Sequence, residues 1–173
     1  MKLDDTDFAL FQLPEQFALD VTLLNVRWKE LQAKVHPDKF ASEGVAAQRI
    51  AMQWSVRINE AYQRLKDPLK RASLLCELAG APIHAEQNTA MPGVFLMQQM
   101  QWREELEEAS NIHQLEALLA QVLEQKNKGF AHIQHFIDHD KNFLACAQEV
   151  RAIMFIQKLI VEIQNKIYDF EDS

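Results

Sequence analysis

Cysteine, glycine and proline are all scarce in this sequence, and each shortage narrows the classes of protein to which it can belong. The 173 residues include 2 cysteines, 4 glycines and 5 prolines. Cys76 and Cys146 lie far apart in the chain and form no CxxC pair, which disfavours a disulfide framework and a zinc module and fits a reducing compartment. So few glycines and prolines indicate that the chain makes few turns.

Positive charge and long apolar runs are scarce as well. The chain has 18 lysines and arginines against 25 aspartates and glutamates, which gives a net charge of −7 at pH 7. The overall field therefore repels a polyanion such as DNA or an acidic membrane, and any basic surface must be local. No stretch approaches the roughly 20 apolar residues of a membrane span, and the acidic opening MKLDDTDFAL contains no long apolar run. With 48% apolar and 25% charged residues, the sequence predicts a soluble, cytoplasmic protein.

Apolar residues recur at three- and four-residue spacing along most of the chain, whereas alternation of period two is nowhere sustained. In the first half, Asp20 can cap a helix that ends at His36, because Pro37 cannot continue it. A second helix runs from about Ala47 to Lys66, and the short connection predicts an antiparallel helical hairpin. Three further helices are expected at 94–109, 112–139 and 141–170. The sequence therefore predicts an all-α protein.

Glycine and proline cluster once between the two helical halves, from Gly80 to Gly93. Such a cluster is typical of a connection between domains. We expect an N-terminal domain that contains the hairpin and the helix after it (1–79), a linker (80–93), and a C-terminal three-helix bundle (94–173). We find no internal repeat and no low-complexity tract.

The first candidate site is the tripeptide His36-Pro37-Asp38, directly after the first long helix. Arg27 and Lys34 are seven residues apart and share one flank of that helix, so a basic flank leads into the tripeptide. Pro37 fixes the exit of the chain, and His36 and Asp38 offer hydrogen-bonding groups on an exposed loop. This arrangement suits docking better than catalysis. Taken alone, the three residues also fit a helix stopped by proline, with Asp38 capping the loop.

Several further short motifs accompany this tripeptide. In the first half they are Leu13-Pro14, Leu19-Asp20, Leu31-Gln32, Lys39-Phe40, Ile58-Asn59-Glu60-Ala61-Tyr62 and Asp67-Pro68-Leu69-Lys70-Arg71-Ala72. In the second half they are Phe95-Leu96-Met97 and Arg103-Glu104-Glu105-Leu106. Together with the tripeptide, the first group resembles a J-domain of the DnaJ class. Both groups resemble, more narrowly, the HscB family of iron–sulfur co-chaperones, and the resemblance covers nearly the whole chain.

The resemblance implies a co-chaperone without catalytic chemistry or a cofactor of its own. In that family, the loop and the preceding helix bind the ATPase domain of a specialised heat-shock chaperone, HscA, and stimulate its ATP hydrolysis. By position, His36, Pro37 and Asp38 would be the signalling residues, with Arg27 and Lys34 as electrostatic contacts.

The second candidate site is the predicted helix 94–109, which has apolar residues on two faces. One face can supply a core and carries Phe95, Gln99, Trp102, Leu106 and Ala109. The opposite side carries Leu96, Met97 and Met100, with Glu104, Glu107 and Glu108 close by. Methionine is flexible and common at adaptable surfaces, so a Met/Leu patch bordered by carboxylates indicates a partner site. A helix buried on two sides is the plainer alternative.

The resemblance gives this surface a partner, because in the HscB family the helix helps bind the cluster scaffold protein IscU. The matching positions are Leu96, Met97, Met100, Gln101, Glu104, Glu108 and, on the last helix, Phe155. Gln101 stands where an acidic residue is expected, so one ionic contact is weakened or absent. The expected function is that of an adaptor between an IscU-like scaffold and an HscA-like chaperone. A general J-domain co-chaperone for unfolded clients stays open as an alternative.

A metal-dependent hydrolase is the remaining alternative, and it depends on three histidines. His132, His135 and His139 are spaced i, i+3, i+7, and imidazoles at such spacing can bind zinc or copper. The side roughly opposite carries apolar residues: Phe130, Ile133, Ile137 and Leu144. We therefore interpret the histidines as a solvated polar face and expect no metal. No GxSxG, P-loop, HExxH or GxGxxG motif is present, which also disfavours an enzyme.

Overall fold

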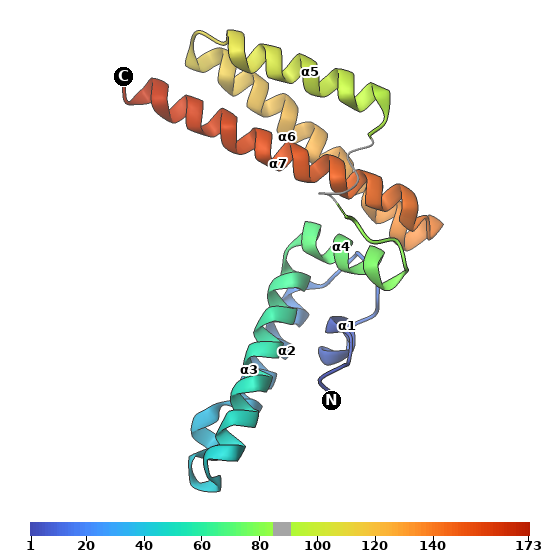
Figure 1. The fold of residues 1–173 in the computed structure, drawn as a ribbon, viewed down its shortest axis with the longest axis vertical. Helices are drawn as coiled ribbons and strands as arrows, with labels where there is room; N and C mark the ends of the chain where they lie inside the picture. The colour runs from blue at the N-terminus through green and yellow to red at the C-terminus, as the bar shows by residue number, and fades with distance from the viewer. Residues whose placement is uncertain (85–90) are drawn as a thin grey trace. The chain divides into compact units, whose positions relative to one another are not determined.

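The computed structural model describes residues 1–84 and 91–173, and within these ranges it contains helices and no strand (Figure 1). The elements are α1 (Asp7–Leu10), α2 (Val21–Val35), the 3-10 helix η1 (Pro37–Glu43), α3 (Val45–Lys66), α4 (Pro68–Leu78), α5 (Gly93–Glu108), α6 (Ile112–Gln134), the π-helical turn η2 (His135–Asp140) and α7 (Phe143–Glu171). The predicted all-α class is confirmed. None of the described helices is long and apolar enough to cross a membrane.

Contacts divide the chain into two compact units, Met1–Leu75 and Cys76–Ser173. The division falls within α4, so the last residues of that helix belong with the C-terminal unit. The predicted linker, 80–93, includes residues 85–90, which lie outside the described residues, and its bounds stay a prediction.

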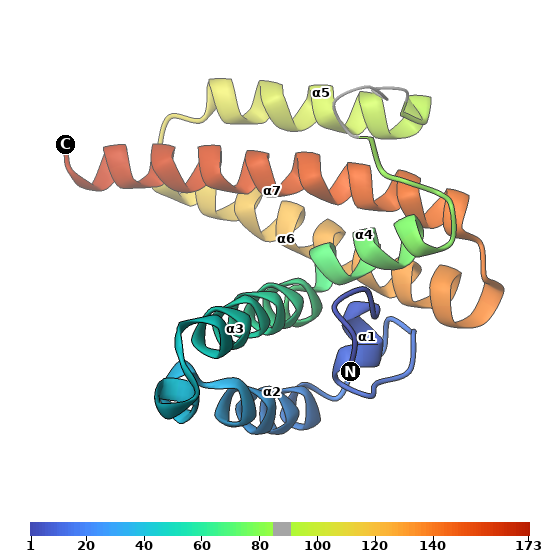
Figure 2. The ribbon, with the colours of Figure 1, turned by 60° about the horizontal axis from the view of Figure 1, so that its bottom comes forward.

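In the N-terminal unit, α2 and α3 lie side by side and η1 reverses the chain between them (Figure 2). Asp20 caps α2 as expected, because its side chain accepts a hydrogen bond from the backbone N–H of Leu23 at 3.0 Å. The rings of Trp28 and Tyr62 stack between the helices with centroids 4.5 Å apart. The indole of Trp28 also donates to the Asn59 side chain at 2.9 Å. The predicted hairpin is therefore held by apolar packing and by polar contacts between its helices.

The segment before α2 is fixed to α3 by a buried carboxylate. Asp7 is 3% exposed and accepts hydrogen bonds from Arg57 at 2.8 Å and from Arg64 at 2.6 and 3.0 Å. Burial alone would raise the pKa of Asp7, but the hydrogen bonds from Arg64 and Arg57 outweigh it and hold that pKa below its usual value. The ionised Asp7 thus anchors α1, whose Phe8 is fully buried.

The C-terminal unit is a bundle of α5, α6 and α7, and both ribbon views place these helices side by side (Figures 1 and 2). Asn111 caps α6 and Asn142 caps α7, each by accepting a backbone N–H three residues ahead. Gly129 lets α6 and α7 approach closely, because a Cβ there would lie 3.0 Å from Ile153 Cδ1. One shared core is buried between the helices: Trp102, Leu106, Ala109, Leu115, Leu118, Val122, Ile156, Leu159, Ile160 and Ile163.

The two cysteines, far apart in sequence, meet inside the C-terminal unit. Cys76 and Cys146 are both 0% exposed, and their sulfur atoms share a hydrogen bond at 3.2 Å. This distance is longer than the roughly 2.05 Å of a disulfide, and both thiols are free. The wide spacing of the cysteines in the sequence gave no sign of this contact.

Candidate functional site

The tripeptide stands at the start of η1, at the outer end of the α2–α3 hairpin. His36 is the N-cap of η1, and Pro37 takes its first position, where a fixed φ and a missing N–H are both tolerated. The backbone N–H of Asp38 donates to His36 Nδ1 at 3.3 Å, and the two side chains are 57% and 91% exposed. His36 and Asp38 are exposed as expected, and Pro37 is half-buried. The loop is a 3-10 helix, which holds the three residues in a defined arrangement.

Arg27 and Lys34 share a flank of α2 but differ in their surroundings. Lys34 is exposed in the last turn of the helix. Arg27 is half-buried, and its guanidinium donates to the carbonyl oxygens of Phe11, at 2.6 Å, and Gln12. Arg27 therefore also ties α2 to the preceding segment, a task that helical spacing could not indicate because the segment lies 15 residues away.

The helix α5 has one buried face and one exposed face. Trp102 and Leu106 are 2% and 8% exposed, in agreement with the expected core face. Met97 and Met100 are 73% and 72% exposed, and Leu96 is 43% exposed. Within the described residues, α5 is therefore buried on one side only, and the alternative of burial on two sides is excluded.

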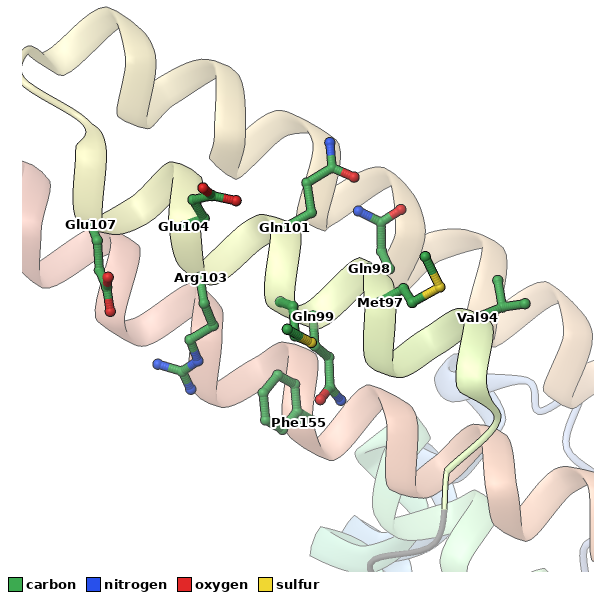
Figure 3. A pocket seen from close by; sticks show the side chains of 10 residues that line it. Val94, Met97, Gln98, Gln99, Gln101, Arg103, Glu104, Glu107 and Phe155 are labelled. Carbon is green, nitrogen blue, oxygen red and sulfur yellow. The ribbon is translucent and has the colours of Figure 1, made fainter.

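Met97 and Met100 lie at the edge of an open hollow of about 1020 Å³. Five of the predicted scaffold-binding residues line it, namely Met97, Met100, Gln101, Glu104 and Phe155, whereas Leu96 and Glu108 do not. Figure 3 shows α5 running alongside α7, with Phe155 projecting from α7 towards α5. The structure thus brings together two segments that are more than fifty residues apart in sequence.

The half-buried ring of Phe155 is held from two sides. The guanidinium of Arg103 stands 5.4 Å from its centroid, and the ring of Phe95 meets it edge to face at 6.3 Å. Arg103 in turn donates to both carboxylate oxygens of Glu162, at 2.5 and 3.2 Å. From the sequence, Arg103 is recognised only as part of a family motif. Its position in the site depends on contacts with α7, which no local sequence pattern reveals.

Comparison with known proteins identifies the family. Residues 91–164 match the family model described as the HSCB C-terminal oligomerisation domain. A protein named Co-chaperone protein HscB homolog from Paraburkholderia phymatum is 49% identical over 168 residues, 95% of either chain. A protein of the same name from Burkholderia cenocepacia is 47% identical over 174 residues, 99% of either chain. This chain belongs to the HscB co-chaperone family.

Solved HscB structures have the same architecture as this member of the family. Chaperone HscB from Vibrio cholerae is 35% identical, with a TM-score of 0.80 over 96% of this chain and 99% of that one. Human co-chaperone protein HscB is 23% identical, with a TM-score of 0.88 over 96% of this chain and 84% of that one, and shows the fold alone. The predicted J-domain followed by a C-terminal helical bundle is therefore confirmed.

The three histidines of this HscB-family chain do not gather at one point. His132, His135 and His139 are all exposed, as expected, and Ile133 and Ile137 are buried. His132 Nδ1 lies 3.7 Å from Glu149 on α7, whereas His135 and His139 both lie against Asp140.

One residue of the expected apolar side was assigned wrongly. Leu144 is 75% exposed, because it stands in the first turn of α7, after a reversal of the chain. The helical phase of α6 does not continue through that reversal, so spacing counted from α6 could not place Leu144.

Proposed function

We propose that this HscB-family chain is an adaptor between two proteins. It binds an IscU-like iron–sulfur scaffold protein through the exposed side of α5 around Met97, Met100 and Glu104, which we call the α5 surface. It binds the ATPase domain of an HscA-like chaperone through His36, Pro37 and Asp38. It stimulates ATP hydrolysis by that chaperone during cluster transfer. The observation that carries the proposal is the exposed pair Met97 and Met100 beside a fixed aromatic ring and a carboxylate rim.

The apolar part of the α5 surface supplies the attraction for the scaffold. A partner that covers Met97 and Met100 removes apolar area from water without disturbing the core, since both side chains are more than two thirds exposed. Full burial of one methionine side chain contributes roughly 1.5–3 kcal/mol. Because Arg103 and Phe95 already hold Phe155, its ring loses little freedom when a partner docks.

Charge around the hollow supplies orientation and partner selection. Glu104 and Glu107 line the hollow and are exposed, so they favour a partner with a basic patch. The side-chain amide of Gln101 donates to Glu105 at 3.1 Å and adds no charge. The rim therefore carries less negative charge than the family pattern implies, and apolar contact supplies more of the affinity.

The chaperone-binding part depends on groups that the fold leaves accessible. The Asp38 carboxylate is 91% exposed and lies 3.6 Å from His36 Nδ1, so a cation of the partner can still reach it. Lys34 gives positive charge to the same end of α2, in a chain whose net charge is −7. Arg27 adds to this field from a fixed position, because two backbone carbonyls hold its guanidinium.

Stimulation of ATP hydrolysis requires no chemistry from this chain. A co-chaperone that binds the hydrolysing conformation of its partner more tightly than the resting one increases the population of the hydrolysing conformation. Holding the scaffold at the same time raises the effective concentration of the scaffold near the chaperone.

The two alternatives are less well supported by the structure. A general co-chaperone for unfolded clients needs a surface that can repack throughout, whereas here Met97 and Met100 are adaptable but Phe155 is fixed by its neighbours. A metal-dependent hydrolase needs acid–base groups in a cleft that excludes water, whereas all six histidines are exposed.

Two sets of variants separate the two surfaces. We expect His36→Gln and Asp38→Asn to abolish stimulation in single-turnover ATP hydrolysis by the chaperone while scaffold binding persists. Glu43→Gln, which removes an exposed charge from the end of η1, is the matched control and should stimulate normally. Normal stimulation by both tripeptide variants would contradict the proposed signalling role.

The scaffold surface is tested with the double variant Met97→Ala, Met100→Ala. Calorimetric titration with the purified scaffold should show weaker binding, and thermal unfolding should change little because no core cavity opens. Met52→Ala, an exposed methionine on α3, is the matched control. Trp102→Ala should instead cost about 3–5 kcal/mol of stability. Unchanged scaffold affinity in the double variant would refute the site.

A further inference from the structure

The junction between α6 and α7 is built from irregular backbone. After Gln134 the α-helix gives way to the π-helical turn η2, and Lys141 then adopts the left-handed conformation with φ 54°. A non-glycine residue in this conformation is uncommon, and π-turns are rare and often found at functional sites. This irregular backbone therefore indicates that the segment has a function besides connecting α6 and α7.

The π-helical turn changes which side chains are neighbours. In a regular α-helix, residues five apart point about 140° away from each other around the axis. A π-turn joins residue i to residue i+5 by a backbone hydrogen bond, which makes the angle between these two positions smaller. His135 and Asp140 are five residues apart within η2, and their contact at 3.3 Å fits this wider backbone. From the sequence no metal is expected, because the histidines are interpreted as a solvated polar face and helical spacing does not bring Asp140 into the set.

Three potential ligands converge at this turn. His135 Nε2 lies 3.3 Å from Asp140 Oδ2, and His139 Nδ1 lies 3.3 Å from Asp140 Oδ1. The two imidazole rings stack with centroids 4.8 Å apart and planes inclined by 16°. One ligand atom from each residue falls within 4.8 Å of the others. All three side chains are exposed, and the inward direction of the turn is filled by Ile137, so the apolar core does not require this cluster.

We propose that His135, His139 and Asp140 bind one divalent first-row transition-metal ion. Two imidazoles and one carboxylate suit zinc, copper, nickel or iron(II), whereas magnesium and calcium prefer oxygen ligands alone. Ligands about 2.0–2.1 Å from a tetrahedral zinc ion lie roughly 3.3–3.4 Å from one another. Each of the two 3.3 Å contacts has that spacing, but they join the histidines to different oxygens of Asp140, so the carboxylate also has to turn. Small rotations of exposed side chains close the remaining gap between the histidines.

The site binds the ion through three protein ligands and leaves further positions to water. Closed structural zinc sites have four ligands and bind far more tightly, so a dissociation constant on the order of micromolar is expected. None of the three residues lines the hollow beside α5. Metal binding is therefore an additional property, and docking of a scaffold does not require it.

Titration of the chelator-treated full chain with zinc chloride, followed by calorimetry, tests the site. We expect one zinc ion per chain in the wild type. Mutation of a residue that only supports a metal ligand typically lowers metal affinity 10–100-fold. His139→Ala and Asp140→Asn remove ligands themselves, so each should lower zinc affinity by at least about tenfold. His113→Ala removes a histidine that is 98% exposed and lies outside the cluster, and it should bind zinc normally.

A second measurement identifies the ligands independently of affinity. Zinc should shift the ring-proton NMR resonances of His135 and His139 and leave those of His113 in place. Circular dichroism of each variant confirms that the fold is intact. The site is overturned if the wild type takes up no zinc at millimolar concentration, or if His113→Ala loses as much binding as His139→Ala. Equal shifts at all histidines would likewise show adventitious surface binding only.

Discussion

At the scale of single residues, charged groups in this chain have two different tasks. Asp38 is almost fully exposed, and we propose that its carboxylate serves a partner. Asp7 is almost fully buried, and its carboxylate serves the fold by pairing with Arg57 and Arg64. Both are aspartates in an acidic sequence, and only their surroundings separate the two roles.

The buried carboxylate makes the stability of the N-terminal unit depend on pH. In the unfolded chain this carboxyl titrates near its ordinary pKa of about 3.9, whereas in the folded chain its pKa is lower. Its stabilising contribution is therefore complete above that ordinary value and is lost as the pH falls through the folded pKa.

The variant Asp7→Asn should lower the free energy of unfolding at pH 7 by about 2–3 kcal/mol. Breaking a fully buried ion pair lowers stability by more than this. The Asp7–Arg64 pair should lose less, because Arg64 is 40% exposed and water can solvate its charge. Denaturant unfolding of wild type and variant measures the difference, which should shrink below pH 4. The exposed Asp4→Asn is the control and should be neutral. A difference that stays constant down to pH 2 would contradict the role of the ionised group.

At the scale of helices, the spacing of apolar residues and the caps predicted most of what the structure contains. Asp20 and Pro37 bound α2, and Ser110-Asn111 separates α5 from α6, because caps and proline act within one helical turn. The same local signals could not predict the π-helical turn η2, because spacing and caps do not distinguish a π-turn from a continued α-helix. They also could not predict that Arg103 would hold Phe155, since that contact joins two helices.

The crossing of α6 and α7 gives a prediction in which two helix effects oppose each other. An alanine at position 129 would stabilise an isolated helix by up to about 1 kcal/mol. In the bundle its Cβ would lie 3.0 Å from Glu149 Oε1 and from Cδ1 of the fully buried Ile153, so both side chains would have to shift inside a packed interface. We therefore expect Gly129→Ala to destabilise the protein by about 1–3 kcal/mol in denaturant unfolding. Gly93→Ala meets nothing within 4 Å and should not destabilise.

At the scale of the whole molecule, the net charge of −7 and the carboxylates beside the hollow act in the same direction. A basic scaffold surface is attracted first by the long-range field and then by the rim itself. Methionine contacts, in contrast, do not depend on salt. The proposed interface thus divides into a part that salt screens and a part that it does not.

The charge reversal Glu104→Lys tests this division. Binding to the scaffold should weaken at low salt, mainly through a slower association rate, and the difference from wild type should diminish as salt rises. Stopped-flow association at several ionic strengths measures the effect. Glu116→Lys, an exposed glutamate on α6 away from the hollow, should have a smaller effect. Equal effects of both variants would place the charge contribution in the overall field rather than at the rim.

The buried thiols of Cys76 and Cys146 allow local opening of the C-terminal unit to be measured by thiol labelling. Both side chains are fully buried, so a thiol reagent can reach them only when the surrounding structure opens. If reclosing is fast, the labelling rate equals the opening equilibrium constant multiplied by the rate for an unprotected thiol. Mass spectrometry can follow the labelling of these native cysteines, so no substitution is needed to introduce a probe. If a scaffold that docks on α5 stabilises the bundle against opening, it should lower the rate of thiol labelling. The variant Asp38→Asn should leave the labelling rate unchanged.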